Sequence, residues 1–285
     1  MFQNNVLLSK ITSFQIGGPA QYFFIAKTEK DLIKALKKAK QSKLAFYILG
    51  KASNVLFSDK GFKGLVIQNQ IKDIKVKKEK IICSSGVTLS YLAQKAKKNN
   101  LSGLEWALSI PGTIGGAVYI NASAFSFAIS DIVEKVRVLD IKNLKIKTLK
   151  NKELKFSKKN SLFLKNKSLI ILSVELKLKK EKKSVIQKKE KEYNLYRNKT
   201  QPLNYPSAGC IFKNPYKKSA GFLIDQAGLK GKTIGGAQIS RVHANYIINF
   251  KKARARDVLE LIKIIKKTVK KKFNVELKEE IQIIL

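Results

Sequence analysis

The first part of the chain alternates short apolar runs with one helical pattern. Leu32, Leu36 and Ala39 recur at the spacing that places side chains on one face of a helix. Thr28 precedes this helix and has an acidic residue three positions later, which is the spacing of an N-terminal capping box. Apolar runs of strand length lie at residues 22–25, 46–49 and 65–67. The pattern predicts a β-α-β arrangement, which is typical of an α/β lobe.

A second group of strands surrounds a helix that begins at Thr88. The helical apolar positions end near Asn99. Residues 136–141 and 144–149 alternate apolar and polar side chains, as the two strands of a β-hairpin do. Further strands are predicted at residues 74–76, 81–83 and 169–176. These elements indicate a second lobe.

Charged residues dominate the stretch from 177 to 191, which has few apolar positions. This composition is typical of a solvated helix or a linker, so we place a domain boundary here. Farther along, Val258, Ile262 and Ile265 mark the buried face of a last helix, and residues 275–285 alternate enough to form a strand. We expect an α+β fold in three parts: lobes at 1–68 and 69–183, and a C-terminal domain at 184–285.

The formal net charge of +38 over 285 residues is extreme. One interpretation is a basic protein that binds nucleic acid or other anions, because lysine and arginine neutralise phosphates. The composition weighs against it, since the basic residues are spread along the whole chain and only five of the 58 are arginine. No nucleic-acid recognition motif is present either. We favour a lysine-biased proteome with solvated surface lysines, and expect no specific nucleic-acid partner.

The two cysteines, Cys83 and Cys210, lie far apart and form no CxxC motif. This spacing argues against a disulfide framework and suits a reducing cytosol. Residues 107–130 carry no charge, but Pro111 and three glycines interrupt the run, which excludes a membrane helix. The N-terminus has no apolar signal-peptide core, and a single histidine cannot build a histidine-rich metal site. We expect a cytoplasmic protein with no metal and no membrane partner.

Two segments carry groups that suit a phosphate. Ile110–Ala117 contains a proline and three glycines, which predict a loop whose N–H groups can turn towards one anion. Gly50–Asn54 follows a predicted strand and offers similar groups, although an ordinary turn fits it equally well. Together the two loops could hold one diphosphate from opposite sides. Neither matches the GxGxxG fingerprint, so a Rossmann-type site is not indicated.

Reactive side chains gather between Ser207 and Pro215. Cys210 offers a thiol, Lys213 a cation, and Asn214 both a donor and an acceptor. A buried structural cysteine beside a turn explains the same pattern.

Three further titratable residues stand out near the C-terminus. A structural role is the favoured interpretation for His243, the only histidine. Glu279 and Glu280 are adjacent, so strand alternation points them to opposite faces and only one is expected to face inward.

These motifs together resemble the UDP-N-acetylenolpyruvoylglucosamine reductase family of flavoenzymes, and they look like its second type. So many motifs in one order make the resemblance specific. It rests on residues 12–20, 50–54, 103–106, 110–117, 201–202, 206–215, 223–231, 243–245 and 277–281. The resemblance implies a two-lobed FAD-binding domain of the vanillyl-alcohol-oxidase-like (PCMH) type. It also implies a C-terminal α/β substrate-binding domain whose last strand returns to the active site.

The resemblance further implies an activity. FAD, with NADPH as co-substrate, would reduce UDP-N-acetylglucosamine enolpyruvate to UDP-N-acetylmuramate, a cytoplasmic step of peptidoglycan precursor synthesis, and we expect a monomer. Lys213 and Asn214 would contact the sugar nucleotide. Arg197 either helps them or is a surface residue. The implied FAD-binding residues are Gly50, Lys51, Ala52, Ser53, Asn54, Pro111, Gly112, Thr113, Gly115, Gly116, Ala117 and Asn121.

The family's catalytic residues map onto Cys210, Glu280 and Lys159. A serine donates the proton in the family, and Cys210 stands in its place; a thiol is more acidic than an alcohol, so it can still donate. Glu280 matches the glutamate that helps to polarise the enolpyruvyl group. Lys159 replaces the arginine that steadies the substrate carboxylate, and lysine keeps the charge but loses the two-pronged geometry.

Other departures from the family's pattern are smaller. Lys158 stands where the family has tyrosine, and Ala52, Ser109 and Ser123 stand where it has glycine. The added Cβ at Ala52, Ser109 and Ser123 would reduce the affinity for FAD. A catalytically decayed relative is therefore an alternative, beside the basic anion-binding protein.

Overall fold

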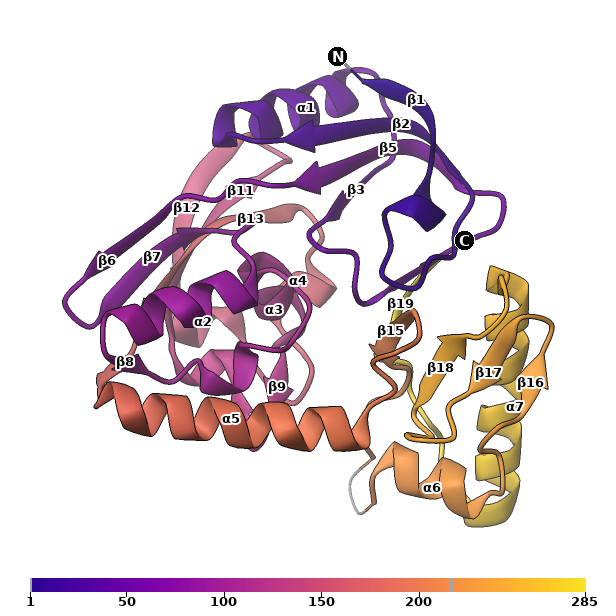
Figure 1. The fold of residues 1–285 in the computed structure, drawn as a ribbon. Coiled ribbons are helices and arrows are strands. Elements are labelled where there is room, and N and C mark those ends of the chain that lie inside the picture. The colour runs from indigo at the N-terminus through magenta and orange to yellow at the C-terminus, as the bar shows by residue number, and fades with distance from the viewer. Residues whose placement is uncertain (1, 216–217) are drawn as a thin grey trace. The chain divides into compact units, whose positions relative to one another are not determined.

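The computed structural model describes residues 2–215 and 218–285 (Figure 1). The chain divides into two compact units. The terminal unit contains residues 1–23, 52–66 and 197–285, and the central unit contains residues 24–51 and 67–196. The domain boundaries expected after residues 68 and 183 stay predictions.

The N-terminal elements form a four-stranded sheet with the order β1-β2-β5-β3. Asp31 N–H donates to Thr28 Oγ1 at 3.1 Å and Thr28 N–H donates to Asp31 Oδ2 at 2.9 Å, so the predicted capping box at the start of α1 (Glu29–Gln41) is confirmed. The strands are β1 (Gln3–Leu7), β2 (Pro19–Ala26), β3 (Phe46–Leu49) and β5 (Phe62–Asn69). Both β2 and β5 begin in the terminal unit and end in the central unit.

A five-stranded sheet with the order β12-β11-β13-β7-β6 forms the frame of the central unit, and all its neighbouring strands are antiparallel. The predicted hairpin is its β11–β12 pair. Helix α3 packs on β13, and the side chains of Trp106 and Phe163 are buried in the core. The strands are β6 (Ile74–Lys77), β7 (Lys80–Ser84), β11 (Val133–Asp140), β12 (Lys145–Lys150) and β13 (Leu169–Lys177).

The remaining elements that begin in the central unit are helices and short strand pairs. The helices are α2 (Leu89–Lys98), α3 (Ile114–Ile120), α4 (Leu162–Lys165) and α5 (Lys183–Thr200). The strand pairs are β8 (Leu101–Ser102) with β14 (Lys179–Lys180), and β9 (Ser123–Ala124) with β10 (Phe127–Ala128).

The terminal unit contains an antiparallel sheet with the order β15-β18-β17-β16. Helix α7 (Ala255–Phe273) lies along β16 and β17 (Figure 1), and Phe14, Phe212 and Leu261 are among the residues of the core. The other elements are β4 (Val55–Phe57), β15 (Ser207–Cys210), α6 (Ala220–Gln226), β16 (Thr233–Ile234), β17 (Ala237–Ile239), β18 (Tyr246–Asn249) and β19 (Gln282–Ile284). Strand β19 pairs with β4 in parallel, so the end of the chain returns to a strand near its beginning.

The structure corrects two predictions about local structure. Of the strand predicted over residues 275–285, only Gln282–Ile284 form one, β19. The sequence predicts a loop over Ile110–Ala117, but helix α3 begins inside this segment. Thr113 caps the helix, since its Oγ1 accepts a hydrogen bond from Gly116 N–H at 3.3 Å. A Cβ on Gly115 would lie 2.7 Å from Ser85 Cβ, so this glycine serves close packing and not a loop conformation.

Most of the charged stretch that suggested a helix or a linker belongs to helix α5, which begins at Lys183 and extends to Thr200. The beginning of the stretch contains the end of β13 and strand β14. None of the helices in the described part of the chain combines the length and the apolar character needed to cross a bilayer.

Candidate active site

Gly50 and the N-terminus of α3 lie against one another in the central unit. A Cβ added to Gly50 would lie 2.8 Å from Thr113 Cγ2 and closer still to Thr113 Oγ1. Only glycine fits at this position without a shift of Thr113. The two segments that the sequence predicted to act together are therefore brought together where Gly50 meets Thr113.

The N–H groups of residues 114–117 are all used within the protein. They donate to Val87 O, Ser85 O, Thr113 Oγ1 and Thr113 O, at 2.8–3.3 Å. In contrast, the N–H groups of Gly112 and Thr113 donate to no acceptor in the part of the chain that the structure describes. Any backbone contact of this segment with an anion would therefore come from residues 112 and 113.

The loop after β3 offers similar groups. Within residues 2–215 and 218–285, the N–H groups of Lys51, Ala52 and Asn54 have no acceptor. Ala52 is buried and has a φ of +50°, a backbone conformation that favours glycine. Asn54 Nδ2 donates to Glu280 O at 3.2 Å, which ties this loop to the C-terminal segment inside the terminal unit.

The side chain of Asn121 is occupied by the protein itself. Asn121 ends α3 with a φ of +50°, and it is buried. Its Nδ2 donates to Ser157 O at 2.9 Å, and its Oδ1 accepts from Ser130 N–H at 3.2 Å. The role of Asn121 in binding FAD stays a prediction, whereas its contact with Ser157 braces the segment that carries Lys159.

Lys159 lies at the tip of a tight turn in the central unit. The backbone groups of Ser157 and Asn160 are hydrogen-bonded to one another in both directions, at 3.1 and 3.0 Å. Lys159 has a φ of +51°, and its Nζ donates to Ser123 O at 3.4 Å. The turn thus fixes the backbone from which this cation projects.

A cluster of polar side chains surrounds Cys210 in the terminal unit. Cys210 is the last residue of β15, and its partner across the sheet is Tyr246 on β18. The Tyr246 phenol and the Cys210 thiol are hydrogen-bonded, and Arg197 and Glu280 are close enough to act electrostatically on Tyr246. We call Arg197, Cys210, Tyr246 and Glu280 the acid cluster. Burial holds the pKa of Tyr246 well above its usual range, so its hydroxyl stays a neutral donor.

Arg197 is the member of the acid cluster that sequence reasoning left undecided. The sequence offered two roles for it, a contact with the substrate or a position on the surface. Its side chain is only 7% exposed, which excludes the surface position. Burial lowers the pKa of its guanidinium, and Tyr246 and Cys210 oppose that shift. One signal was present in the sequence, because arginine is rare in a chain that uses lysine almost everywhere else.

Glu279 and Glu280 have different neighbours. Lys266 Nζ donates to Glu279 Oε1 at 2.7 Å on the outside of α7. Glu280 N–H donates to Ile211 O at 2.8 Å, which places its backbone beside Cys210. Of the two residues, only Glu280 contributes to the acid cluster.

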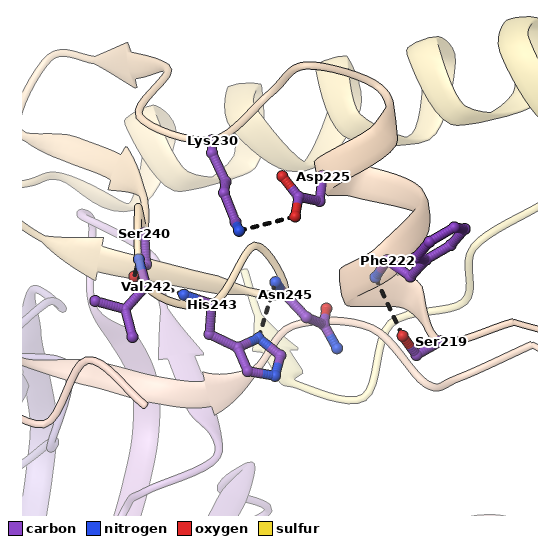
Figure 2. A network of polar contacts seen from close by, with 8 residues as sticks. All are labelled: Ser219, Phe222, Asp225, Lys230, Ser240, Val242, His243 and Asn245. Atoms are coloured by element: carbon purple, nitrogen blue, oxygen red, sulfur yellow. Dashed lines mark hydrogen bonds and ion pairs between the residues drawn. The ribbon is translucent and has the colours of Figure 1, made fainter. Parts of the chain in front are cut away.

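His243 and Asn245 hold the chain next to Cys210 in place (Figure 2). Asn245 N–H donates to His243 Nδ1 at 3.2 Å, and Ile211 N–H donates to Asn245 O at 2.8 Å. Burial lowers the pKa of His243, so the imidazole is neutral and accepts at Nδ1. These contacts support the structural role that the sequence favoured for His243.

The two residues expected to contact the sugar nucleotide follow β15. Lys213 N–H donates to Lys278 O at 2.9 Å. Asn214 is exposed, and its Oδ1 accepts from Ala220 N–H at 2.9 Å at the start of α6. The amide oxygen of Asn214 is therefore structural, and its NH₂ group is the part that a ligand could use.

Two family models match the chain. Residues 201–284 match the family model of the UDP-N-acetylenolpyruvoylglucosamine reductase C-terminal domain. Residues 20–149 match the family model of an FAD-binding domain. The predicted combination of an FAD-binding domain with this C-terminal domain is confirmed.

Full-length relatives lead to the same family. A UDP-N-acetylenolpyruvoylglucosamine reductase of Caldanaerobacter subterraneus is 44% identical over 281 residues, which are 98% of this chain and 92% of that protein. One of Clostridium novyi is 40% identical over 283 residues, covering 99% and 92%. The crystal structure of the UDP-N-acetylenolpyruvylglucosamine reductase of Thermus caldophilus matches with a TM-score of 0.85 and 34% identity, and each chain is covered completely.

Proposed function

Because the chain belongs to the UDP-N-acetylenolpyruvoylglucosamine reductase family, we propose that it reduces UDP-N-acetylglucosamine enolpyruvate to UDP-N-acetylmuramate in peptidoglycan precursor synthesis. FAD is the cofactor and NADPH the co-substrate. The observation that carries the proposal is the acid cluster, in which Cys210 lies across the sheet from Tyr246 and next to the residue that Glu280 N–H binds, while Arg197 acts electrostatically on Tyr246 and Cys210. This set can both protonate a carbon atom and bind an anion.

The residues of the two predicted loops fit FAD. In the central unit, the N–H groups of Lys51, Gly112 and Thr113 have no acceptor among the described residues and suit a diphosphate, and the contact of Gly50 with Thr113 joins the loops. When bound, FAD carries a hydride from NADPH to the terminal carbon of the enolpyruvyl group. Side chains of the protein carry out the other steps.

Cys210 supplies the proton. Hydride addition leaves negative charge on the carbon that bears the carboxylate, and this carbon needs a proton from one side. The Cys210 S–H bond breaks, and the proton goes to that carbon. The hydrogen bond with Tyr246 holds the sulfur in one orientation. Glu280 helps to polarise the enolpyruvyl group.

Lys159 stabilises the charge that spreads into the substrate carboxylate. Lysine offers a point charge in place of the family's arginine, so this contribution is weaker than in relatives that keep arginine. Lys213 and the NH₂ group of Asn214 contact the sugar nucleotide, and the enzyme acts as a monomer. A Lys159→Ala variant with unchanged kcat/KM would remove Lys159 from this scheme.

A spectroscopic experiment tests the function. The purified protein should absorb near 450 nm, lose this band with anaerobic NADPH, and regain it when UDP-N-acetylglucosamine enolpyruvate is added. A protein that binds and reduces flavin but is not reoxidised by the substrate would be a decayed relative. A colourless protein that retains no 450 nm absorbance after incubation with FAD and removal of the unbound cofactor would contradict the proposal altogether. Light scattering of the same sample measures whether it is a monomer.

A further inference from the structure

Arg197 is a buried cation that forms no ion pair with a carboxylate among the described residues. It lies in the last turn of α5, and its side chain is 7% exposed. Its Nε is inaccessible to water and donates to no acceptor in the described chain, and the nearby buried Gln201 Oε1 receives no hydrogen bond there either. A buried guanidinium in this state lacks the compensation that such groups normally have.

The groups that face Arg197 do not neutralise it. Tyr246 on β18 and Cys210 on β15 are the groups that act on it electrostatically, and the Tyr246 hydroxyl is neutral. Glu280 acts on Tyr246 but is not among the groups that shift the pKa of Arg197. The C-terminal end of α5 favours a cation only weakly. Burial of a guanidinium costs more than this gain, so an anion from outside the protein would offset the remaining cost.

We propose that Arg197 binds the carboxylate of the enolpyruvyl group, an inference that rests on the proposed function. The carbon that Cys210 protonates is bonded directly to this carboxylate. Arg197 acts electrostatically on Cys210 in the same unit of the fold, so its charge lies on the side of the site where this carboxylate would bind. Arginine presents two parallel N–H donors that match a carboxylate, which Lys159 does not. Arg197 thus supplies the two-pronged contact that the lysine substitution removed elsewhere.

The test compares Arg197→Met and Arg197→Lys, both loaded with FAD, with the unmodified protein. Methionine fills a similar volume without a charge, so Arg197→Met should raise the Tm of the FAD-loaded enzyme measured without a sugar nucleotide, which we call the ligand-free enzyme. UDP-N-acetylglucosamine enolpyruvate should raise the Tm of the unmodified protein but not that of Arg197→Met. UDP-N-acetylglucosamine has the diphosphate but lacks the carboxylate, and it should shift the Tm of both proteins equally.

Arg137 provides a matched control. Its guanidinium donates to both carboxylate oxygens of Glu29, at 2.7 and 2.5 Å, so it already has its counter-ion. Arg137→Met should lower the ligand-free Tm and leave the response to both nucleotides intact. The opposite signs of the two Tm changes separate an unpaired arginine from a structural one.

Rapid kinetics adds a second readout. In Arg197→Met, flavin reduction by NADPH should proceed at the normal rate, while reoxidation by the enolpyruvyl substrate should be about 100-fold slower. Arg197→Lys should restore part of this loss.

Three results would overturn the assignment. A lower ligand-free Tm in Arg197→Met would make Arg197 structural. Equal loss of response to both nucleotides would assign Arg197 to the diphosphate. An undiminished response to the enolpyruvyl substrate would remove Arg197 from binding. If the unmodified protein binds this substrate through Arg197 but is not reoxidised by it, the proposed function fails and the binding role stands.

Discussion

The side chain of Asn245 forms two hydrogen bonds with the backbone of Phe212, one as acceptor and one as donor, and we call this pair of contacts the clasp. Its Oδ1 accepts from Phe212 N–H at 3.0 Å, and its Nδ2 donates to Phe212 O at 2.8 Å. Both residues are buried, with exposed fractions of 2% and 1%. Cys210 lies two residues before Phe212, so this clasp determines where the strand that carries the thiol runs.

The clasp predicts a large effect for Asn245→Ala. The substitution leaves two buried backbone groups of Phe212 without partners, and each costs about 1–3 kcal/mol. We expect a loss of about 2–4 kcal/mol in the free energy of unfolding, measured by urea denaturation of the FAD-loaded protein. Asn214→Ala is the control. Among the described residues its side chain makes a single, part-buried hydrogen bond at the start of α6, and the loss of this bond should cost no more than about 1 kcal/mol. Equal losses of unfolding free energy in the two variants would show that the clasp stabilises the fold no more than the single hydrogen bond of Asn214 does.

Replacement of the Cys210 thiol separates the two half-reactions. Cys210→Ala should be reduced by NADPH at the normal rate but should not be reoxidised by the enolpyruvyl substrate, because no acid remains to protonate the carbon. Cys210→Ser places a hydroxyl donor at the same position and should recover reoxidation. Stopped-flow absorbance near 450 nm measures both steps. Normal reoxidation in Cys210→Ala would exclude Cys210 as the proton donor.

Ser109 carries a buried hydroxyl that no described residue satisfies. Ser109→Ala removes the unpaired oxygen, so it should raise the stability by about 1 kcal/mol. Ser161 is the matched control, since its Oγ donates to Tyr119 O at 2.6 Å and accepts from Phe163 N–H at 3.2 Å. Ser161→Ala should therefore destabilise. Thermal unfolding of both variants checks the opposite signs, and a Tm decrease in Ser109→Ala would mean that its hydroxyl has a partner.

The left-handed conformation of Ala52 predicts a gain from glycine. At a φ of +50° an alanine is strained by about 1–2 kcal/mol, and glycine is not. Glycine also loses more entropy on folding, so the expected net gain for Ala52→Gly is about 0.5–1 kcal/mol. Urea denaturation measures the gain in stability, and titration with FAD tests whether the Cβ of Ala52 also weakens cofactor binding in the unmodified protein. Lower stability in Ala52→Gly would show that the Cβ packs usefully enough to outweigh the strain.

Local signals in the sequence were sufficient for some elements and not for others. The capping box of Thr28 and Asp31 needs only neighbours in the chain, so its spacing predicts the start of α1 correctly. The role of Gly115 depends on Ser85 in another segment, so the sequence cannot distinguish a packing glycine from a loop glycine. Likewise, the pairing of Cys210 with Tyr246 arises from strand register, and the burial of Arg197 from tertiary packing. The motifs thus identify the family, while the acid cluster becomes visible only in the fold.

The two cysteines should differ sharply in reactivity. Cys83 is 1% exposed, and burial raises the pKa of its thiol to about 12. The Cys83 thiol is therefore protonated at pH 8. Because only the thiolate reacts with iodoacetamide, Cys83 is unreactive at this pH. Cys210 is partly exposed and should be the single residue modified, which peptide mass spectrometry can measure. Labelling of Cys83 should begin only as the pH approaches 12 or the protein unfolds. In Cys210→Ser no labelling is expected at pH 8, and modification of Cys83 in that folded variant would contradict its burial.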